Sequence, residues 1–399
     1  MVARRIRVDL CRPPARCGRL VIPIALPLLA DEEAEAAREA VLSGWVSQGP
    51  QVAAFERDFA TLVGAPHACA VSNCTTALHL ALVALDIGPG DEVITVSHSF
   101  IATANCVRYC GATPVFVDID PDTYNIDPER VAEAITTSTR AIIAVHQMGM
   151  PCDLAALVAI ADRHGLALIE DAACAAGSQI QVNGSWDRIG KPYGRIACFS
   201  FHPRKVITTG EGGMLTTSDP ELDRKFRLLR QHGMSVPDTV RHGSPQVIFE
   251  DYLAVGFNYR MTDIQAAVGR KQLTRLPDIV ARRRTLAARY SELLGNVEGL
   301  SLPFEPEWAR SNWQSYCVRL PSNVDQRTVM QKLLDRGIAT RRGIMCSHRE
   351  PPYSNAKQRH ELHQSELAQD RAILLPIYAQ MKDEDLELVA STLRAEVSQ

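Results

Sequence analysis

The chain has 399 residues, of which 46% are hydrophobic and 22% are charged, and its formal net charge is −3. These values are ordinary for a globular protein and exclude the strongly basic surface of a nucleic-acid or membrane-surface binder. The 11 cysteines are scattered without a repeated C-x-x-C spacing. This argues against a disulfide framework and a zinc ribbon, and favours reduced thiols in a cytoplasm.

The N-terminal segment differs from the rest of the chain. Residues 1–19 are rich in arginine, and the apolar stretch VIPIALPLLA that follows is short and runs into the acidic DEEAEAAREAV. A membrane span needs about 20 apolar residues, and no stretch of the chain reaches that length. We expect a poorly ordered extension at residues 1–21, a large domain at 22–260 and a small C-terminal domain at 261–399.

Seven short β-branched runs predict the strands of the large domain, and helical patterns such as TTALHLALVAL separate most of them. This alternation implies an α/β fold with a mainly parallel, seven-stranded sheet that is covered on both faces. Ligands of such sheets bind beyond the carboxyl ends of the strands, so residues after each strand are site candidates. The predicted strands are 68–72, 92–97, 113–119, 141–146, 166–172, 196–202 and 212–217.

Amphipathic patterns predict further helices before and after these strands in the sequence. Two lie upstream, at 31–44 and 50–64, and each is closed by a glycine. Downstream, a long basic helical pattern begins near residue 261, and Pro277 is expected to kink or break it. The small α+β domain is then completed by a strand at 314–320 and helices at 325–337 and 383–397.

One lysine stands beside a glycine-rich turn. Lys205 lies in SFHPRKVITTGEGG, directly after a predicted strand. Most lysines are solvated surface residues, which is one interpretation. A phosphate loop is another, but there the glycines precede the lysine, so the order is wrong. The third interpretation is a desolvated lysine whose amine forms a Schiff base.

Two carboxylates, Glu170 and Asp171, end the apolar strand in LALIEDA. A carboxylate at this place is costly unless a cation accompanies it. The ring nitrogen of pyridoxal phosphate (PLP) is one such cation, and a protonated ring works as an electron sink. An N-cap of the next helix is the alternative role for Asp171.

Polar groups also follow the strand at 68–72. Hydroxyl, amide and backbone N–H groups gather there at the start of a helix, which is a ready site for a phosphate. Plain N-capping of the helix is the alternative. The residues that offer these groups are Ser72, Asn73, Thr75 and Thr76.

An aromatic residue follows the strand at 92–97. Phe100 would project over the edge of the sheet, where its ring could stack on a planar cofactor or else join the core. A phosphate site, a stacking ring, a carboxylate and an amine therefore follow strands of one predicted sheet. The chain has no dinucleotide fingerprint. PLP uses all four features, so it is the cofactor that the sequence predicts.

Longer phrases in the chain are LDIGPGDEVI, GATPVFVDIDPDTYNIDP, IEDAA, CFSFHPRKVITTGEGGML and VGFNYRMTDIQAAVGRKQL. With these phrases the chain resembles the DegT/DnrJ/StrS-type sugar aminotransferases, which are PLP enzymes of the aspartate-aminotransferase fold (fold type I). The resemblance runs from about residue 22 to the last predicted helix.

The resemblance implies a role for each candidate residue. Lys205 matches the lysine that forms the Schiff base and then moves the proton, and Asp171 matches the aspartate that pairs with the pyridine nitrogen. Phe100 matches the aromatic residue that stacks on the ring. The matches to phosphate ligands are Thr75, Thr76, Ser200 and, from the neighbouring subunit, Asn258. The last match implies a homodimer with active sites at its interface.

One position departs from the family pattern. After EDAA the family has histidine or glutamine near the phenolic oxygen of the cofactor, and this chain has Cys174. A thiol is a weak hydrogen-bond donor, so the ring is expected to be held or tuned differently. Cys74 stands where glycine is common in the phosphate turn. We expect Cys106 and Cys110 to be core residues, and we expect no metal site.

The resemblance further implies the reaction. An amino acid, glutamate by analogy, gives its amino group to a keto-sugar, which is nucleotide-linked for most of the family. Cyclitol ketones of the scyllo-inosose type and aminohydroxybenzoate synthesis remain alternatives. Candidates for a diphosphate clamp are Arg341, Arg342, His348 and Arg349.

Two other classes of function stay open at this point. A PLP lyase such as a sugar dehydratase uses the same scaffold, but the family's dehydratases replace the lysine with histidine, so Lys205 argues against that class. A non-catalytic PLP-binding regulator is favoured by Cys174 alone. Lys205 and Asp171 argue against it, because a pure binder needs neither a proton shuttle nor an electron sink.

Overall fold

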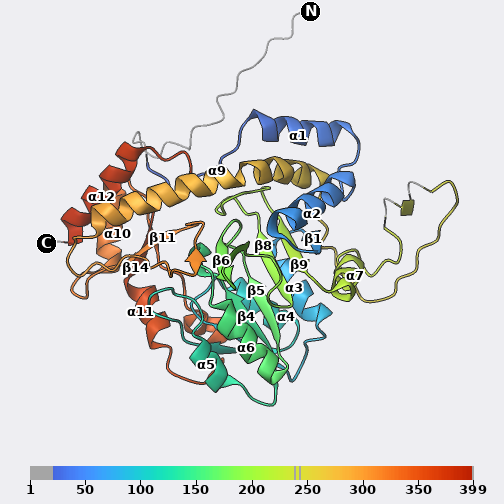
Figure 1. Ribbon diagram of the computed structural model, residues 1–399, viewed down its shortest axis with the longest axis horizontal. Helices are drawn as coiled ribbons and strands as arrows, with labels where there is room; N and C mark the ends of the chain where they lie inside the picture. Colours follow the sequence, from blue (N-terminus) through green and yellow to red (C-terminus); the bar gives the residue numbers. More distant parts are fainter. Residues whose placement is uncertain (1–20, 238–239, 242–243, 398–399) are drawn as a thin grey trace, which may run out of the picture.

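The computed structural model describes residues 21–237, 240–241 and 244–397, so nearly all of the expected extension at residues 1–21 lies outside the described residues. A large sheet occupies the centre of the molecule, and helices surround it (Figure 1). None of the helices in the described ranges has both the length and the apolar character that crossing a membrane requires.

All seven predicted strands form, and they share one sheet. They are β1 (His67–Val71), β2 (Glu92–Val96), β3 (Thr113–Val117), β4 (Thr139–Val145), β5 (Ala167–Asp171), β8 (Ile196–Ser200) and β9 (Gly213–Thr217). The two-residue β13 (Lys357–Gln358) extends the edge, and the order is β1-β9-β8-β5-β4-β2-β3-β13. β9 is antiparallel to both neighbours and the other pairings are parallel, which confirms the mainly parallel α/β prediction.

Two hydrophobic cores lie on the two faces of the sheet. Ile142 and Phe199 belong to one core. Their sequence neighbours on the same strands, Ile143 and Cys198, belong to the other core. Successive residues of a strand point to opposite faces, which explains the continuous apolar runs. The first core includes α2 (Pro50–Val63), α5 (Pro128–Ala134), α6 (Leu154–His164) and α9 (Asp263–Leu294); the second includes α3 (Cys74–Ala84), α4 (Ala102–Tyr109) and α7 (Pro220–Leu229).

The long helix α9 joins distant parts of the chain. It runs through Pro277 without ending there, so the proline does not break it. Its first residue, Asp263, is buried, and the carboxylate accepts hydrogen bonds from the backbone N–H groups of Gly49, Gln51 and Val52 at 2.7, 3.0 and 2.9 Å. The first N–H groups of helix α2 have no acceptor inside the helix, and its own N-cap, Gly49, has no side chain to satisfy them. Asp263 therefore caps α2 from 211 to 214 positions away.

The chain after α9 builds a smaller sheet and a third core. β14 (Ala372–Leu375) pairs with β11 (Tyr316–Arg319) and β12 (Arg341–Arg342), and α10 (Gln326–Asp335), α12 (Asp383–Val397) and the end of α9 share its core. β13 instead pairs with β3 of the large sheet. The domain boundary at residues 260/261 stays a prediction. The remaining elements are α1 (Asp31–Leu42), β6 (Gln179–Val182), β7 (Ser185–Arg188), β10 (Ala309–Arg310) and α11 (His363–Arg371).

Candidate active site

The candidate residues follow strands whose carboxyl ends meet at one edge of the large sheet. β5 ends at Asp171, and the neighbouring parallel strand β8 ends at Ser200. β1 has the same direction as β8, because both are antiparallel to β9. The turn at residues 72–76 therefore opens at this edge as well. The structure therefore brings Asp171, Ser200 and the turn at residues 72–76 to one edge of the sheet, although they lie far apart in the sequence.

Asp171 is a buried carboxylate that has no ion-pair partner in the described part of the chain, and it is 5% exposed. Its Oδ2 accepts a hydrogen bond from the hydroxyl of Thr103 at 2.8 Å, and its Oδ1 accepts one from the N–H of Ala173 at 3.2 Å. Burial raises the pKa of Asp171, although these hydrogen bonds and nearby Lys205 oppose the shift. No helix begins directly after Asp171, so the N-cap interpretation is wrong. Such a carboxylate suits a cationic ring atom.

Glu170, the other carboxylate of this strand, is already paired. Its Oε2 lies 3.0 Å from Nε2 of His146, and its Oε1 accepts a hydrogen bond from the N–H of Gly194 at 3.2 Å. Nδ1 of His146 accepts a hydrogen bond from the N–H of Cys152, so Nε2 carries the proton and donates to Glu170. Adjacent residues of a strand face opposite sides of the sheet, so Glu170 and Asp171 point in opposite directions. Asp171 is therefore the carboxylate that remains for the site.

Lys205 lies in the turn after β8 and meets a thiol. Its Nζ is 3.1 Å from Sγ of Cys174. Burial lowers the pKa of Lys205, but Cys174, Cys74 and Asp171 together raise it by more, so the net shift is upward. The carbonyl of Cys174 accepts a hydrogen bond from Nδ2 of Asn312 at 2.8 Å, which holds the loop in place. The amine is therefore not a freely solvated surface group.

The turn before α3 combines a helix cap with open donors. Oδ1 of Asn73 accepts a hydrogen bond from the N–H of Thr76 at 2.9 Å, and Oγ1 of Thr76 accepts one from the N–H of Asn73 at 3.2 Å. The capping interpretation is therefore confirmed for these two side chains. The hydroxyl of Thr75 has no hydrogen-bond partner within the described ranges, and the first N–H groups of a helix have no acceptor inside it. These groups remain for an anion.

Gly213, the first residue of β9, lies against this turn. A Cβ atom added to it would lie 2.5 Å from the backbone carbon and oxygen of Asn73, and both atoms belong to the main chain. A side chain at this position therefore cannot be accommodated by a rotamer change.

We expect Gly213→Ala to displace the turn before α3 and to destabilise the fold by about 1–3 kcal/mol, the usual cost of overpacking. Thermal unfolding and PLP titration would measure the two effects. Gly88→Ala is the matched control, because an added Cβ there meets nothing within 4 Å. Equal melting temperatures and PLP affinities for the two variants would contradict the prediction.

Three further predicted residues, Phe100, Ser200 and Asn258, differ in exposure and in position. Phe100 is 68% exposed, so its ring is not part of the core. It lies one helical turn before Thr103, which contacts Asp171. Ser200 is 8% exposed at the end of β8. Asn258 is exposed and its backbone pairs with that of Gln231; the structure gives its side chain no contact with the other candidates.

The sequence analysis missed several residues that hold the site. Thr103 positions Asp171, and Asn312 holds the loop of Cys174. Nε2 of Gln314 donates a hydrogen bond to the carbonyl of Arg204 at 2.8 Å, which fixes the residue before Lys205. Of these residues, only Thr103 could have been predicted as part of the site, because it lies three residues after the candidate Phe100, about one helical turn away. The other contacts join segments more than 100 positions apart.

Three of the four side chains suggested for a diphosphate clamp already contact an acidic side chain. Arg341 is the exception, because it has no acidic partner in the part of the chain that the structure describes. The three paired side chains are Arg342 with Glu350 at 3.9 Å, His348 with Glu366 at 3.0 Å and Arg349 with Asp370 at 2.6 Å.

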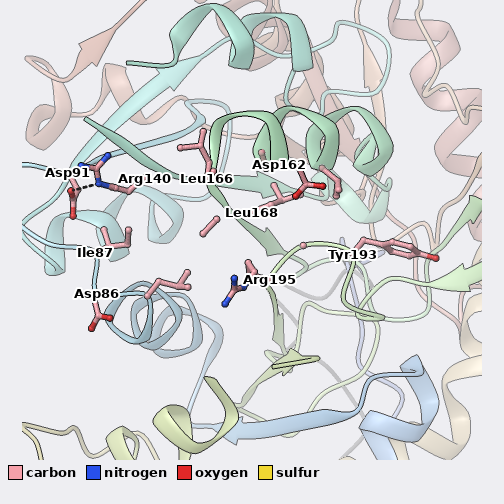
Figure 2. Close-up of a pocket in the computed structure, with 15 residues that line it drawn as sticks. Asp86, Ile87, Asp91, Arg140, Asp162, Leu166, Leu168, Tyr193 and Arg195 are labelled. Carbon is pink, nitrogen blue, oxygen red and sulfur yellow. Dashed lines mark ion pairs between the residues drawn. The ribbon is translucent and has the colours of Figure 1, made fainter. Parts of the chain in front are cut away.

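A pocket of about 710 Å³ opens at the opposite ends of the same strands (Figure 2). It is lined by Ala167, the first residue of β5, whereas Asp171 is the last. An ion pair in its wall joins Nε of Arg140 to Oδ1 of Asp91 at 3.4 Å. None of the candidate residues lines this pocket, so it is separate from the candidate active site.

Comparisons with known proteins agree with this geometry. A model of the DegT/DnrJ/EryC1/StrS aminotransferase family matches residues 27–394. The spore coat polysaccharide biosynthesis protein SpsC of Bacillus subtilis (strain 168) is 39% identical over 379 residues, which cover 94% of this chain and 96% of that protein.

Solved structures are similar over nearly the whole chain. The aminotransferase TlmJ from Streptoalloteichus hindustanus has a TM-score of 0.87 at 35% identity, covering 94% of this chain and 99% of that one. The PLP form of Spr1654 from Streptococcus pneumoniae has a TM-score of 0.87 at 26% identity, covering 95% and 99%. Its pyridoxamine phosphate (PMP) form has a TM-score of 0.88, also at 26% identity, covering 94% and 99%. The chain belongs to the DegT/DnrJ/EryC1/StrS aminotransferase family, whose members depend on PLP.

Proposed function

We propose that the chain is a PLP-dependent aminotransferase that moves an amino group from glutamate to a nucleotide-linked keto-sugar. The observation that carries the proposal is the convergence of Lys205, Asp171 and the turn before α3 at one edge of the sheet. The relative in spore coat polysaccharide biosynthesis supports a sugar acceptor.

The residues at this edge fit PLP. Asp171 is a buried carboxylate that lacks an ion-pair partner within the described residues, so it suits the protonated ring nitrogen. The hydroxyl of Thr75, which has no partner among the described residues, and the N–H groups that begin α3 suit the phosphate, with Thr76 and Ser200 beside them. Phe100 offers an exposed ring for stacking.

Bound PLP would supply the electron sink for negative charge at the donor's α-carbon. Asp171 keeps the ring nitrogen protonated, and the hydroxyl of Thr103 fixes the carboxylate. Lys205 anchors the cofactor, then removes the proton from the donor's α-carbon and returns a proton in the second half-reaction. Cys174 contacts the amine of Lys205 and so helps to position it.

We further propose a homodimer. Residues 244–257 belong to the arm that extends from the body between α7 and α9 (Figure 1). Large exposed apolar side chains gather on it, and such a patch supports a protein–protein interface. They are Val247, Phe249, Tyr252, Leu253 and Val255. Asn258 follows this arm directly, in agreement with a role in the phosphate site of the neighbouring subunit.

A cytoplasmic location belongs to the same proposal. The nine described cysteines are free thiols, and thiols stay reduced in a cytoplasm.

We expect glutamate to convert the PLP-loaded chain to its PMP form. An absorbance spectrum would record the loss of the Schiff-base band, and 2-oxoglutarate should restore it. Alanine and glutamine at equal concentration serve as donor controls. A band that no amino acid changes would contradict the aminotransferase proposal.

The acceptor can be found from the reverse change. The PMP form would be mixed with nucleotide-linked keto-sugars, free keto-sugars and cyclitol ketones, and recovery of the Schiff-base band would be recorded. Recovery with the nucleotide-linked sugars alone supports the proposed acceptor, whereas recovery with a cyclitol ketone alone overturns it.

A further inference from the structure

The contact between Cys174 and Lys205 places a sulfur and an amine 3.1 Å apart inside the proposed active site. Both side chains are partly buried and lie at the sheet edge where ligands are expected to enter. Asn312 holds the carbonyl of Cys174, and the turn from His202 to Lys205 is closed by a backbone hydrogen bond of 2.8 Å. The two reactive atoms are therefore held against each other by the fold.

The other described thiols lack this arrangement. Seven of the nine described cysteines are buried, and only Cys110 and Cys174 are partly exposed. Burial raises the pKa of Cys110 to about 11, which suppresses its thiolate. Among the residues that the structure describes, no amine lies within hydrogen-bonding distance of the sulfur of Cys110, whereas Cys174 contacts Lys205. The susceptibility of a thiol to peroxide increases with its exposure, and Cys174 combines partial exposure with a neighbouring amine.

We propose that Cys174 is an oxidative modification site, at which hydrogen peroxide joins its sulfur to Nζ of Lys205 through a covalent S–N bond. In the first step the sulfur attacks peroxide and the O–O bond breaks. One oxygen stays on the sulfur as a sulfenic acid, and the other leaves as water. The sulfur loses two electrons and the peroxide gains them.

In the second step Nζ of Lys205 attacks the sulfur of the sulfenic acid. The S–O bond breaks, and the leaving hydroxide takes a proton from the amine to form a second water molecule. No further oxidant is needed. One thiol, one amine and one hydrogen peroxide thus give one S–N bond and two water molecules, and the chain loses two hydrogen atoms.

The surroundings of Lys205 favour this second step. The amine already lies at contact distance, so its effective concentration at the sulfur is far above that of any thiol in solution. Burial lowers the pKa of Lys205, and the neighbouring Cys174 is one of the groups that raise it. The second step needs the neutral amine, and burial of Lys205 favours that form.

The bond would make the chain unable to form a Schiff base, because the amine of Lys205 is consumed. A thiol reductant would attack the sulfur and release both side chains. This consequence rests on the proposed function, since it requires Lys205 to be the cofactor's anchor. The S–N bond itself does not depend on that role.

The test is the intact mass of the full-length chain after hydrogen peroxide, followed by peptide mapping. The expected product is lighter by about 2 Da and contains a linked pair of peptides with Cys174 and Lys205; dithiothreitol should reverse the change. Cys110→Ser is the matched control and should give the same product. Cys174→Ser and Lys205→Ala should not form it.

Two results would overturn the proposal. One is a gain of about 16 or 32 Da at Cys174 without any linked peptides, which means simple oxidation. The other is a loss of about 2 Da that persists in Lys205→Ala, which means a disulfide, with Cys74 as a candidate because Cys174 influences its pKa.

A parallel experiment separates this proposal from the proposed function. PLP added before the peroxide should prevent the loss of about 2 Da, because the amine of Lys205 is then engaged. Linked peptides in the absence of PLP, together with no protection by PLP, would support the modification site and contradict the anchoring role of Lys205.

Discussion

Replacing Lys205 with alanine is expected to slow the half-reaction with glutamate by at least about 10³-fold. A single positioned acid–base group contributes about 10²–10⁴-fold, and this variant also loses the covalent anchor of the cofactor. The rate would be followed by stopped-flow absorbance and by the 2-oxoglutarate that forms. The variant should still bind PLP without a covalent bond, because Asp171 and the turn before α3 are unchanged.

Lys191→Ala is the control for this variant. Lys191 forms an ion pair with Asp187 at 2.8 Å. None of its contacts among the described residues involves a candidate site residue. Its replacement should leave the half-reaction unchanged. Turnover that survives in Lys205→Ala would remove Lys205 from the mechanism.

The second large effect is expected for Asp171→Asn, which keeps the shape of the side chain and removes its charge. Breaking a buried ion pair costs about 3–5 kcal/mol, which corresponds to a loss of about 10²-fold or more in rate. Without the carboxylate, the ring nitrogen would lose its proton and the electron sink would weaken. Single-turnover kinetics with glutamate would measure the loss.

Thr103→Val tests the same carboxylate from its other side. It removes the hydrogen bond of 2.8 Å to Oδ2 of Asp171 but keeps the charge. A hydrogen bond to a charged group is worth about 1.5–3 kcal/mol, so we expect a smaller loss than in Asp171→Asn.

One outcome would contradict the prediction for Asp171→Asn. Equal rates for wild type and Asp171→Asn would mean that the carboxylate does not serve the ring nitrogen.

The seven strands of the large sheet were predictable because their apolar runs meet a physical requirement. Residues such as Ile142 and Ile143 face two different cores, so neither side of the strand can be polar. Once the strands are placed, the edge that holds Asp171 and Lys205 follows from the parallel topology. This is why the candidate residues could be named before their contacts were known.

Other elements lacked such a pattern or had a signal that was overlooked. β13 is two residues long, and its pairing with β3 depends on the path of the preceding chain. The hairpin of β6 and β7 turns at Asn183 and Gly184, which both have positive φ. Asn-Gly is a strong hairpin signal, so this element could have been predicted.

The supporting contacts of the site could not be read from the sequence. Asn312 reaches the carbonyl of Cys174 across 138 positions, and Gln314 reaches that of Arg204 across 110. Amide side chains of this kind occur throughout any chain, and nothing local distinguishes these two. The contact of Lys205 with Cys174 was equally hidden, since it depends on how the loops after β5 and β8 face each other.

The cap that Asp263 provides for α2 sets an order of events during synthesis. The N–H groups at Gly49, Gln51 and Val52 leave the ribosome long before their acceptor is made. Domains usually fold as units while the chain is produced. Here the cap of α2 is the carboxylate of Asp263, which is translated 211 to 214 residues after the N–H groups that it binds. Helix α2 therefore gains its cap only after the start of α9 has been made, and a chain that ends before Asp263 would leave these N–H groups without their acceptor.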